Sequence, residues 1–146
     1  MNTPCAHEMS GWEHFAHGAD MGIRGRGPTL ASAFEQSALA MMAVITDIDS
    51  VMPRERVAVA CEASEPDLLL VEWLNALVYE MATRRMLFSR FSVHLEDGRL
   101  SAEAWGELVN VEQHQPAVEV KGVTYTALEV SRRADGDWIA QCVVDV

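Results

Sequence analysis

The strongest constraint on the fold is a two-residue turn in the second half of the chain. Asp97-Gly98 lies between residues 87–95 and residues 100–105, two runs in which hydrophobic and polar residues alternate. An Asp-Gly pair between such runs is a strong β-hairpin signal, because both residues tolerate the positive φ angles of a tight turn. The sequence therefore predicts an antiparallel pair of strands here.

A second pair of strands is predicted at the end of the chain. Residues 118–130 and 138–146 are rich in hydrophobic residues and are joined by Ala134-Asp135-Gly136-Asp137, and residues 56–61 indicate a further strand. Successive side chains of a strand point to opposite faces. The last strand therefore has two sets of residues, with Trp138, Ala140, Cys142, Val144 and Val146 on one face and Ile139, Gln141, Val143 and Asp145 on the other.

Two segments have the spacing of amphipathic helices. The first follows Pro28 with Thr29 as its N-cap, and the second opens at Ser64, with Asp67 completing an approximate capping box and Pro66 in the first turn. Cations at residues 84 and 85 favour a helix end there. The residues expected in the core are Leu30, Phe34, Ala38, Met41 and Ile45 in the first helix, and Leu70, Trp73, Leu74, Leu77, Val78 and Met81 in the second.

Helices and strands that are segregated along the chain predict an α+β fold. We expect the two helices to pack on one side of a curved, mainly antiparallel sheet. A length of 146 residues suits one domain with a real core, and we assign this domain to residues 11–146. Residues 1–10 lack hydrophobic periodicity and are predicted to form a disordered tail.

Charge and cysteine content limit the classes of function. The chain has 22 acidic and 11 basic residues, a formal net charge of -11, which argues against broad binding to nucleic-acid backbones and permits a divalent cation or a basic protein partner. Its three cysteines include no C-x-x-C pair, so we expect a reducing cytoplasm with Cys61 and Cys142 as small buried strand residues. Neither a signal peptide nor a membrane span is visible, since residues 68–81 contain Glu72, Asn75 and Glu80.

The candidate chemistry lies at the two ends of the chain. The stretch W-E-H-F-A-H-G-A-D-M-G-I-R-G, residues 12–25, places Asp20 among glycines and hydrophobic residues, and the chain ends in Val143-Val144-Asp145-Val146. Asp20, Asp145 and the α-carboxylate of Val146 would give three oxygen donors, which suit a hard cation such as Ca²⁺, Mg²⁺ or Mn²⁺. The alternative is that Val146 is solvated and that Asp145 pairs with Lys121 or Arg90.

Other polar residues carry weaker signals. His14 and His17 lie three apart in extended or turn structure, which is no zinc pattern. Asp47 and Asp49 follow the first helix in polar company and are expected to be solvated or turn-forming, the alternative being that one lies near the metal. The sequence has no G-x-S-x-G, phosphate-binding loop, H-E-x-x-H or Cys-His nucleophile pair, so motifs give little support to a free-standing enzyme.

The chain resembles the archeases, which are small acidic partners of RtcB-type RNA ligases. Several motifs match, and they occur in the same order and with the same spacing. The resemblance runs from about residue 12 to residue 146. It is carried by the stretch at residues 12–25, then P-T-L-A-S-A-F-E-Q-S-A-L-A-M-M-A-V-I-T-D, L-L-L-V-E-W-L-N-A-L-V-Y, L-F-S-R-F, E-V-K-G-V-T-Y and the terminal V-V-D-V. Two departures are Gly18, where the family usually has threonine, and Gly122, where alanine is more usual. Both are small-for-small changes beside the expected site.

This resemblance implies an α+β fold and a metal site formed by Asp20, Asp145 and Val146. It also implies an accessory protein, not an enzyme, that helps an RtcB-type ligase to become guanylylated and to turn over repeatedly in tRNA splicing or RNA repair. Arg90, Lys121 and Tyr125 lie in the other family motifs and are candidates for partner or phosphate contact, with structural ion pairs and a strand tyrosine as the alternative.

Two other classes of function remain open from the sequence. A metal-dependent phosphoester hydrolase would use the same carboxylates together with an open coordination position and a general base. A chaperone-like interaction domain would bind its partner whether or not Asp20 holds a metal. The first would turn over a phosphoester unaided, and the second would be indifferent to Asp20→Ala.

Overall fold

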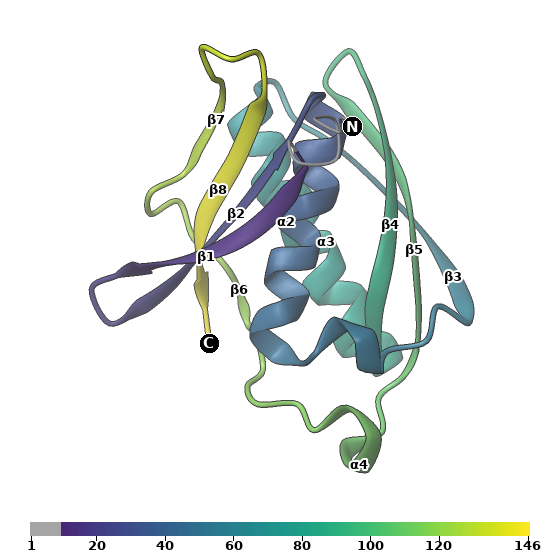
Figure 1. Ribbon diagram of the computed structural model, residues 1–146. Coiled ribbons are helices and arrows are strands. Elements are labelled where there is room, and N and C mark those ends of the chain that lie inside the picture. The colour runs from purple at the N-terminus through teal and green to yellow at the C-terminus, as the bar shows by residue number, and fades with distance from the viewer. Residues whose placement is uncertain (1–9) are drawn as a thin grey trace, which may run out of the picture.

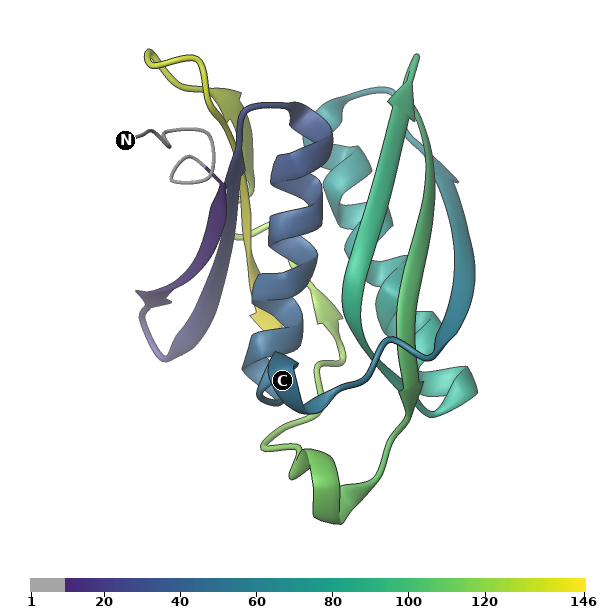
Figure 2. The same cartoon turned by 45° about the vertical axis from the view of Figure 1, so that its right-hand side comes forward.

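The computed structural model describes residues 10–146 and contains two antiparallel sheets with two long helices between them (Figures 1 and 2). The elements are β1 (Gly11–His17), β2 (Asp20–Gly27), α2 (Leu30–Ile45), the short 3-10 helix η1 (Ile48–Ser50), β3 (Glu55–Glu62), α3 (Pro66–Arg84), β4 (Met86–Glu96), β5 (Arg99–Leu108), α4 (Val111–His114), β6 (Gly122–Val123), β7 (Glu129–Arg132) and β8 (Trp138–Asp145). The predicted α+β class is confirmed. Of the predicted tail, all but Ser10 lies outside the described residues.

The strands separate into two sheets, where the sequence pattern suggested one. The first sheet has the order β1-β2-β8-β6, with β7 also paired to β8, and the second has the order β3-β5-β4. Helix α2 contacts β2 and β8 on one side and β4 on the other. It can do so because its buried residues spread around much of its circumference: Ala33, Phe34, Ser37, Ala38, Ala40, Met41, Met42 and Ile45.

The first helix begins where the sequence predicts. The hydroxyl of Thr29 accepts a hydrogen bond from the Ser32 amide, and the Ser32 hydroxyl accepts one from the Thr29 amide, each at 3.0 Å. The predicted capping box of α3 is wrong. Pro66 is the first helical residue, so the cap position falls on Glu65, which makes no side-chain capping bond, and Ser64 lies outside the helix.

Helix α2 sits against the first sheet at unusually short range. A Cβ atom at Gly25 of β2 would lie 2.2 Å from the amide nitrogen of Ser37 and 2.3 Å from the carbonyl oxygen of Ala33. The buried Ser37 hydroxyl lies 2.8 Å from the carbonyl oxygen of Ala140 in β8. On the other side of α2, the indole of Trp73 donates to the Phe34 carbonyl at 3.1 Å and joins the two helices. The helix pair is therefore fixed to the first sheet by backbone contact.

The predicted hairpin around residues 97 and 98 is confirmed as β4–β5, with positive φ at both Asp97 (51°) and Gly98 (76°). The second predicted pair is only partly confirmed. Residues 118–130 form no single strand, because a turn marked by a bond from the Leu128 amide to the Tyr125 carbonyl separates β6 from β7. Both short strands pair with β8.

Of the two strand cysteines, Cys142 is buried and Cys61 only half-buried. Within residues 10–146, no helix combines the length and hydrophobicity needed to cross a membrane.

Candidate functional site

The glycine-rich stretch near the N-terminus forms a hairpin. Strands β1 and β2 pair in a register that sets His17 opposite Asp20, with only Gly18 and Ala19 between them. Gly18 has φ of +62°, the left-handed geometry that a two-residue hairpin turn requires at its first central position and that glycine adopts without strain. The turn thus places Asp20 at the very start of β2.

The pairing of β2 with β8 brings the two ends of the chain together. Met21 pairs with Val144, so the same register continued by one residue sets Asp20 beside Asp145. Residues of the opposite parity, Ile23 and Cys142, are fully buried against the helices. The two aspartates therefore belong to the outer face of the first sheet, where both are exposed.

Val146 follows Asp145 directly and is 54% exposed. Among residues 10–146 there is no group of three or more His, Cys, Asp and Glu side chains placed to hold a metal ion. Two carboxylate side chains are thus neighbours at this end of the sheet, and the main chain of Val146 follows the second of them. The donors available are all oxygens, the type that hard divalent cations prefer.

Two of the three predicted contact residues flank this site. The Lys121 amide donates to the Asp145 carbonyl at 2.7 Å, and Tyr125, 67% exposed, follows β6 on the same side of β8. Arg90 does not belong here. It lies on β4 in the second sheet, with its guanidinium carbon 4.9 Å from the ring centre of Trp105. Within the described part of the chain, Asp145 forms no ion pair with Lys121 or Arg90.

The two histidines of the hairpin have different surroundings. His14 Nε2 lies 2.8 Å from the carbonyl oxygen of Ala40, which ties β1 to α2. His17 is exposed and is the cross-strand neighbour of Asp20. The aspartates after α2 are turn-forming, as predicted, since the Asp47 carboxylate accepts from the Asp49 amide at 3.0 Å and caps η1.

Comparison with known proteins identifies the family. Residues 12–146 match the Archease protein family. The chain belongs to this family. It is 38% identical to the protein archease of Pyrococcus furiosus over 142 residues, which cover 94% of this chain and 100% of that protein. It is also 38% identical to the protein archease of Methanosarcina acetivorans, with coverage of 92% and 95%.

The fold agrees with this assignment. The solution structure of Methanobacterium thermoautotrophicum protein 1598 superposes with a TM-score of 0.81 at 34% identity and covers 93% of this chain and 99% of that one. The matched residues of this archease family member include both the hairpin and β8, and therefore both aspartates.

Packed side chains of β1 and β2 adjoin the aspartates on the outer face of the first sheet, an arrangement that was not predicted. A Cβ atom at Gly22 would lie 2.3 Å from the ring of Phe15, so the phenyl ring occupies the space beside this glycine. The Arg24 guanidinium lies over the ring, 4.6 Å from its centre, and donates hydrogen bonds to Glu13 and Gln141. A glycine opposite an aromatic residue in a hairpin was the only signal available.

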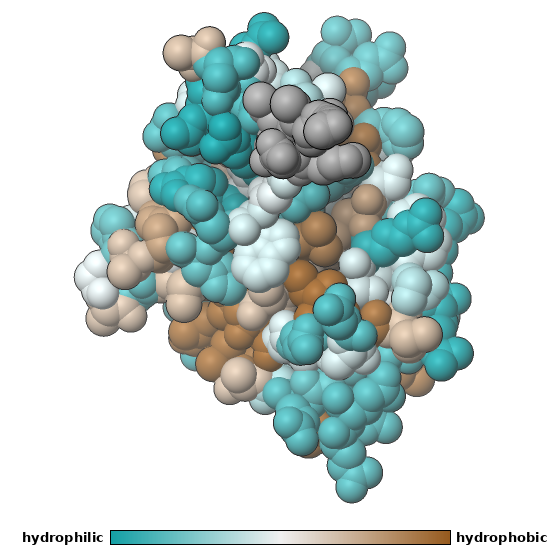
Figure 3. Space-filling view, viewed as in Figure 1, coloured by the Kyte–Doolittle hydropathy of each residue, from teal (hydrophilic) through white to brown (hydrophobic). Residues whose placement is uncertain are grey.

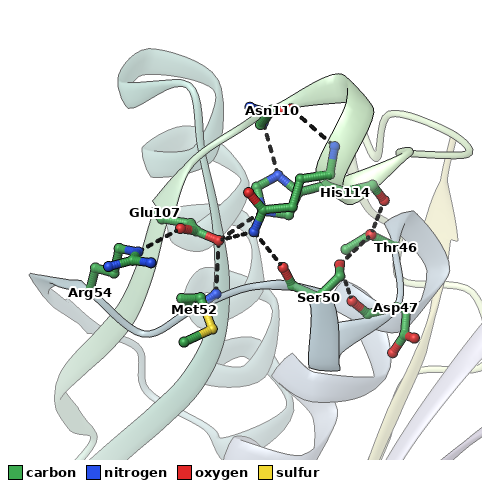
Figure 4. A network of polar contacts seen from close by, with 9 residues as sticks. Thr46, Asp47, Ser50, Met52, Arg54, Glu107, Asn110 and His114 are labelled. Carbon is green, nitrogen blue, oxygen red and sulfur yellow. Dashed lines mark hydrogen bonds and ion pairs between the residues drawn. The ribbon is translucent and has the colours of Figure 1, made fainter.

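A second polar cluster links β5, η1 and α4 (Figure 4). The Glu107 carboxylate accepts from the Met52 amide and from His114 Nε2, each at 2.9 Å, and from Arg54 Nε at 3.1 Å. The Met52 bond, then the His114 bond, lower the pKa of Glu107 from 4.5 to about 2. His114 Nδ1 accepts from the Asn110 amide at 2.9 Å. Since a backbone amide can only donate, the proton of this ring is on Nε2.

This cluster has a structural role. The His114 side chain is fully buried and both of its ring nitrogens are hydrogen-bonded within the protein. It therefore has neither a free lone pair nor access to a substrate, although a His–Glu pair would suit acid–base chemistry elsewhere.

The molecule also has a hydrophobic groove where α2 reaches the surface between β1 and β4. In Figure 3, hydrophobic residues show through this gap. Trp12, Leu39, Ala43 and Val44 are among the residues that line it. Asp47 and Asp49 also line the groove, but the Asp47 carboxylate caps η1. The aspartate pair at the end of the first sheet therefore remains the candidate site.

Proposed function

We propose that this member of the archease family is a metal-binding accessory protein of an RtcB-type RNA ligase, with a role in tRNA splicing or RNA repair. It would promote guanylylation of the ligase and so allow multiple turnover, without itself being an enzyme. The observation that carries the proposal is the register of β2 and β8, which sets two exposed aspartates side by side.

The proposed metal ligands are Asp20, Asp145 and the main-chain carboxylate of Val146. Their chemistry fits Ca²⁺, Mg²⁺ or Mn²⁺, because all three are oxygen donors and two are side chains held by paired strands. A cation bound there would supply positive charge for a nucleotide phosphate at the interface with the ligase. The protein's own residues would fix the position of this charge on the exposed face of the sheet.

The partner is proposed to be a protein. An acidic chain of net charge -11 repels RNA phosphates and suits a basic surface such as that of a nucleotide-dependent ligase. Lys121 and Tyr125 flank Asp145 and are exposed, so we assign them to contacts with the partner or with its nucleotide phosphates. Arg90, on the other sheet, is left out of this surface. We place the protein in the cytoplasm with its proposed partner.

A multiple-turnover RNA ligation assay tests this function. An RtcB-type ligase with GTP and Mn²⁺ should join more RNA molecules per ligase when the wild-type protein is added, and Asp20→Asn should give little increase. Asp49→Asn removes an exposed carboxylate outside the site and should act like the wild type. The protein alone should neither join RNA nor hydrolyse GTP. Turnover that is unchanged at saturating wild-type protein would refute the proposal, and GTP hydrolysis by the protein alone would support a hydrolase.

The role of Val146 has its own test. One residue added after Val146 replaces its carboxylate by a neutral amide and moves the terminal charge by about 3.3 Å along the strand direction. Metal affinity should fall, whereas a tag placed before residue 10 should leave it unchanged. Equal affinity in the two tagged proteins would remove Val146 from the site.

A further inference from the structure

Strand β6, which lies beside the proposed metal site, is very short. It has two residues, Gly122 and Val123, paired with Asp145 and Val144 of β8. Beyond this pairing, the Lys121 amide donates to the Asp145 carbonyl at 2.7 Å, and the Thr124 amide donates to the Val143 carbonyl at 2.9 Å. The Thr124 hydroxyl donates to the same Val143 carbonyl at 3.0 Å. A strand of only two residues depends on such contacts, and on those at its outer edge, for its position.

The outer edge of β6 is fixed by a side chain from helix α3. Asn75 Oδ1 accepts the Val123 amide at 3.0 Å, so it takes the place that a further strand would occupy. The fit is close, since a Cβ atom at Gly122 would lie 3.2 Å from the same oxygen. Glycine at this position therefore leaves the acceptor free to approach the strand.

Strand β6, which Asn75 holds, is in turn hydrogen-bonded to the end of β8, where Asp145 lies. On one side, the end of β8 is held by β2, where Met21 pairs with Val144. On the other side it is held by β6 and by Lys121 just before it, whose amide donates to the carbonyl of Asp145 itself. A displacement of β6 would therefore reach the main chain of Asp145 directly.

We infer that Asn75 is a positioning residue of the proposed metal site: its amide oxygen fixes β6 and, through β6, the main chain of Asp145 and the chain end. This inference rests on the proposed function for its metal-binding consequence. Its structural part, the hold of Asn75 on β6, stands on the contacts alone. Helix α3 is anchored in the hydrophobic core, with Trp73, Leu74 and Leu77 fully buried, so Asn75, on the exposed side of this helix, links the chain end to the core.

Three variants of the full chain test the inference. Asn75→Ala removes the acceptor, Asn75→Asp keeps an acceptor oxygen at the same position, and Tyr79→Ala changes an exposed residue one turn further along the helix as a control. Mn²⁺ affinity is measured by electron paramagnetic resonance titration. Amide hydrogen exchange at Lys121, Val123 and Thr124 is measured by NMR without metal.

Asn75→Ala should lose protection at the Val123 amide, exchange faster at Lys121, and bind Mn²⁺ about threefold to tenfold more weakly, the range expected for one hydrogen bond. Asn75→Asp should restore both protection and affinity, and Tyr79→Ala should match the wild type. Wild-type Mn²⁺ affinity in Asn75→Ala, despite lost protection at Val123, would overturn the inference. So would restored affinity in Asn75→Asp without restored protection, because charge alone would then explain it.

The two proposals fail in different ways. If the wild-type protein binds no Mn²⁺, the proposed metal site is wrong. Exchange at Lys121 then still decides whether Asn75 holds β6 on Asp145: faster exchange in Asn75→Ala supports this, and unchanged exchange refutes it.

Discussion

Glu107 should give this protein a measurable part of its stability, and that part should disappear in acid. Its carboxylate accepts hydrogen bonds from Met52, Arg54, Gln113 and His114. Glu107→Ala leaves two buried or half-buried donors, the Met52 amide and His114 Nε2, without a partner. At about 1–3 kcal/mol for each unsatisfied donor, the expected loss in the free energy of unfolding is about 2–6 kcal/mol. Each kcal/mol lowers the melting temperature by about 2–4 °C in a chain of this size.

Glu107→Gln tests the charge of the side chain alone, because glutamine has nearly the same shape as glutamate. Glutamine keeps a carbonyl acceptor but no negative charge, so the loss should be about 1–2 kcal/mol. The pKa of Glu107 is lowered in the folded protein from 4.5 to about 2. A lowered pKa stabilises the folded state above the unfolded pKa, and this contribution is lost as the pH falls towards the folded value.

Urea unfolding of the wild type and Glu107→Gln between about pH 6 and about pH 3 is the assay. The difference in stability should be constant above about pH 5 and should shrink below the unfolded pKa of 4.5. A difference that stays the same throughout this range would show that the charge of Glu107 contributes nothing and would refute the reasoning.

Three further outcomes are expected. Gly25→Ala should lower the free energy of unfolding by about 3 kcal/mol or more, because its Cβ would meet the backbone of α2 at 2.2 Å, and a loss below about 1 kcal/mol in urea unfolding would contradict this packing. Thr29→Ala should cost about 1 kcal/mol by removal of the N-cap, whereas unchanged thermal melting would show that the cap is dispensable. Burial raises the pKa of the Cys142 thiol to about 12, so iodoacetamide at pH 8 should leave Cys142 unmodified in the folded protein, and mass spectrometry that finds it alkylated would contradict its burial.

Local signals predicted the individual elements well. The β4–β5 hairpin follows from Asp97-Gly98, whose positive φ angles are a property of the turn itself. The start of α2 also follows from a local signal, because the Thr29 hydroxyl caps the helix by accepting a hydrogen bond from the Ser32 amide. The start of α3 was missed because Ser64 and Pro66 are both helix-start signals two residues apart, and the proline determined the boundary.

The assembly of these elements depends on contacts that no local pattern contains. Alternation shows which residues of a strand share a face but not which strands pair, so the division into two sheets around α2 was not predictable. Likewise, Arg90 lies in one of the motifs by which the chain resembles the family, and only the structure shows it on the second sheet against Trp105.

In the candidate site, the two aspartates were predicted from the sequence, whereas the role of Asn75 was not. Asp20 and Asp145 lie far apart in the sequence, and they were proposed as a pair first from their carboxylate chemistry and then from the resemblance to the archeases. The register of β2 and β8 supplies a physical reason for their proximity. Asn75 was visible in the sequence only as a polar residue in a hydrophobic helix, and its bond to the Val123 amide depends on the three-dimensional arrangement.

The proposed metal site is best tested by titrating four proteins with Mn²⁺ and measuring the bound ion by electron paramagnetic resonance. The four proteins are the wild type, Asp20→Asn, Asp145→Asn and the control Asp49→Asn. We expect one site in the wild type and in Asp49→Asn, and an affinity weaker by about tenfold or more in each of the other two variants, because each loses a charged oxygen donor. If Asp20→Asn and Asp145→Asn bind Mn²⁺ as tightly as Asp49→Asn does, the paired aspartates do not form a metal site and the proposed function is refuted.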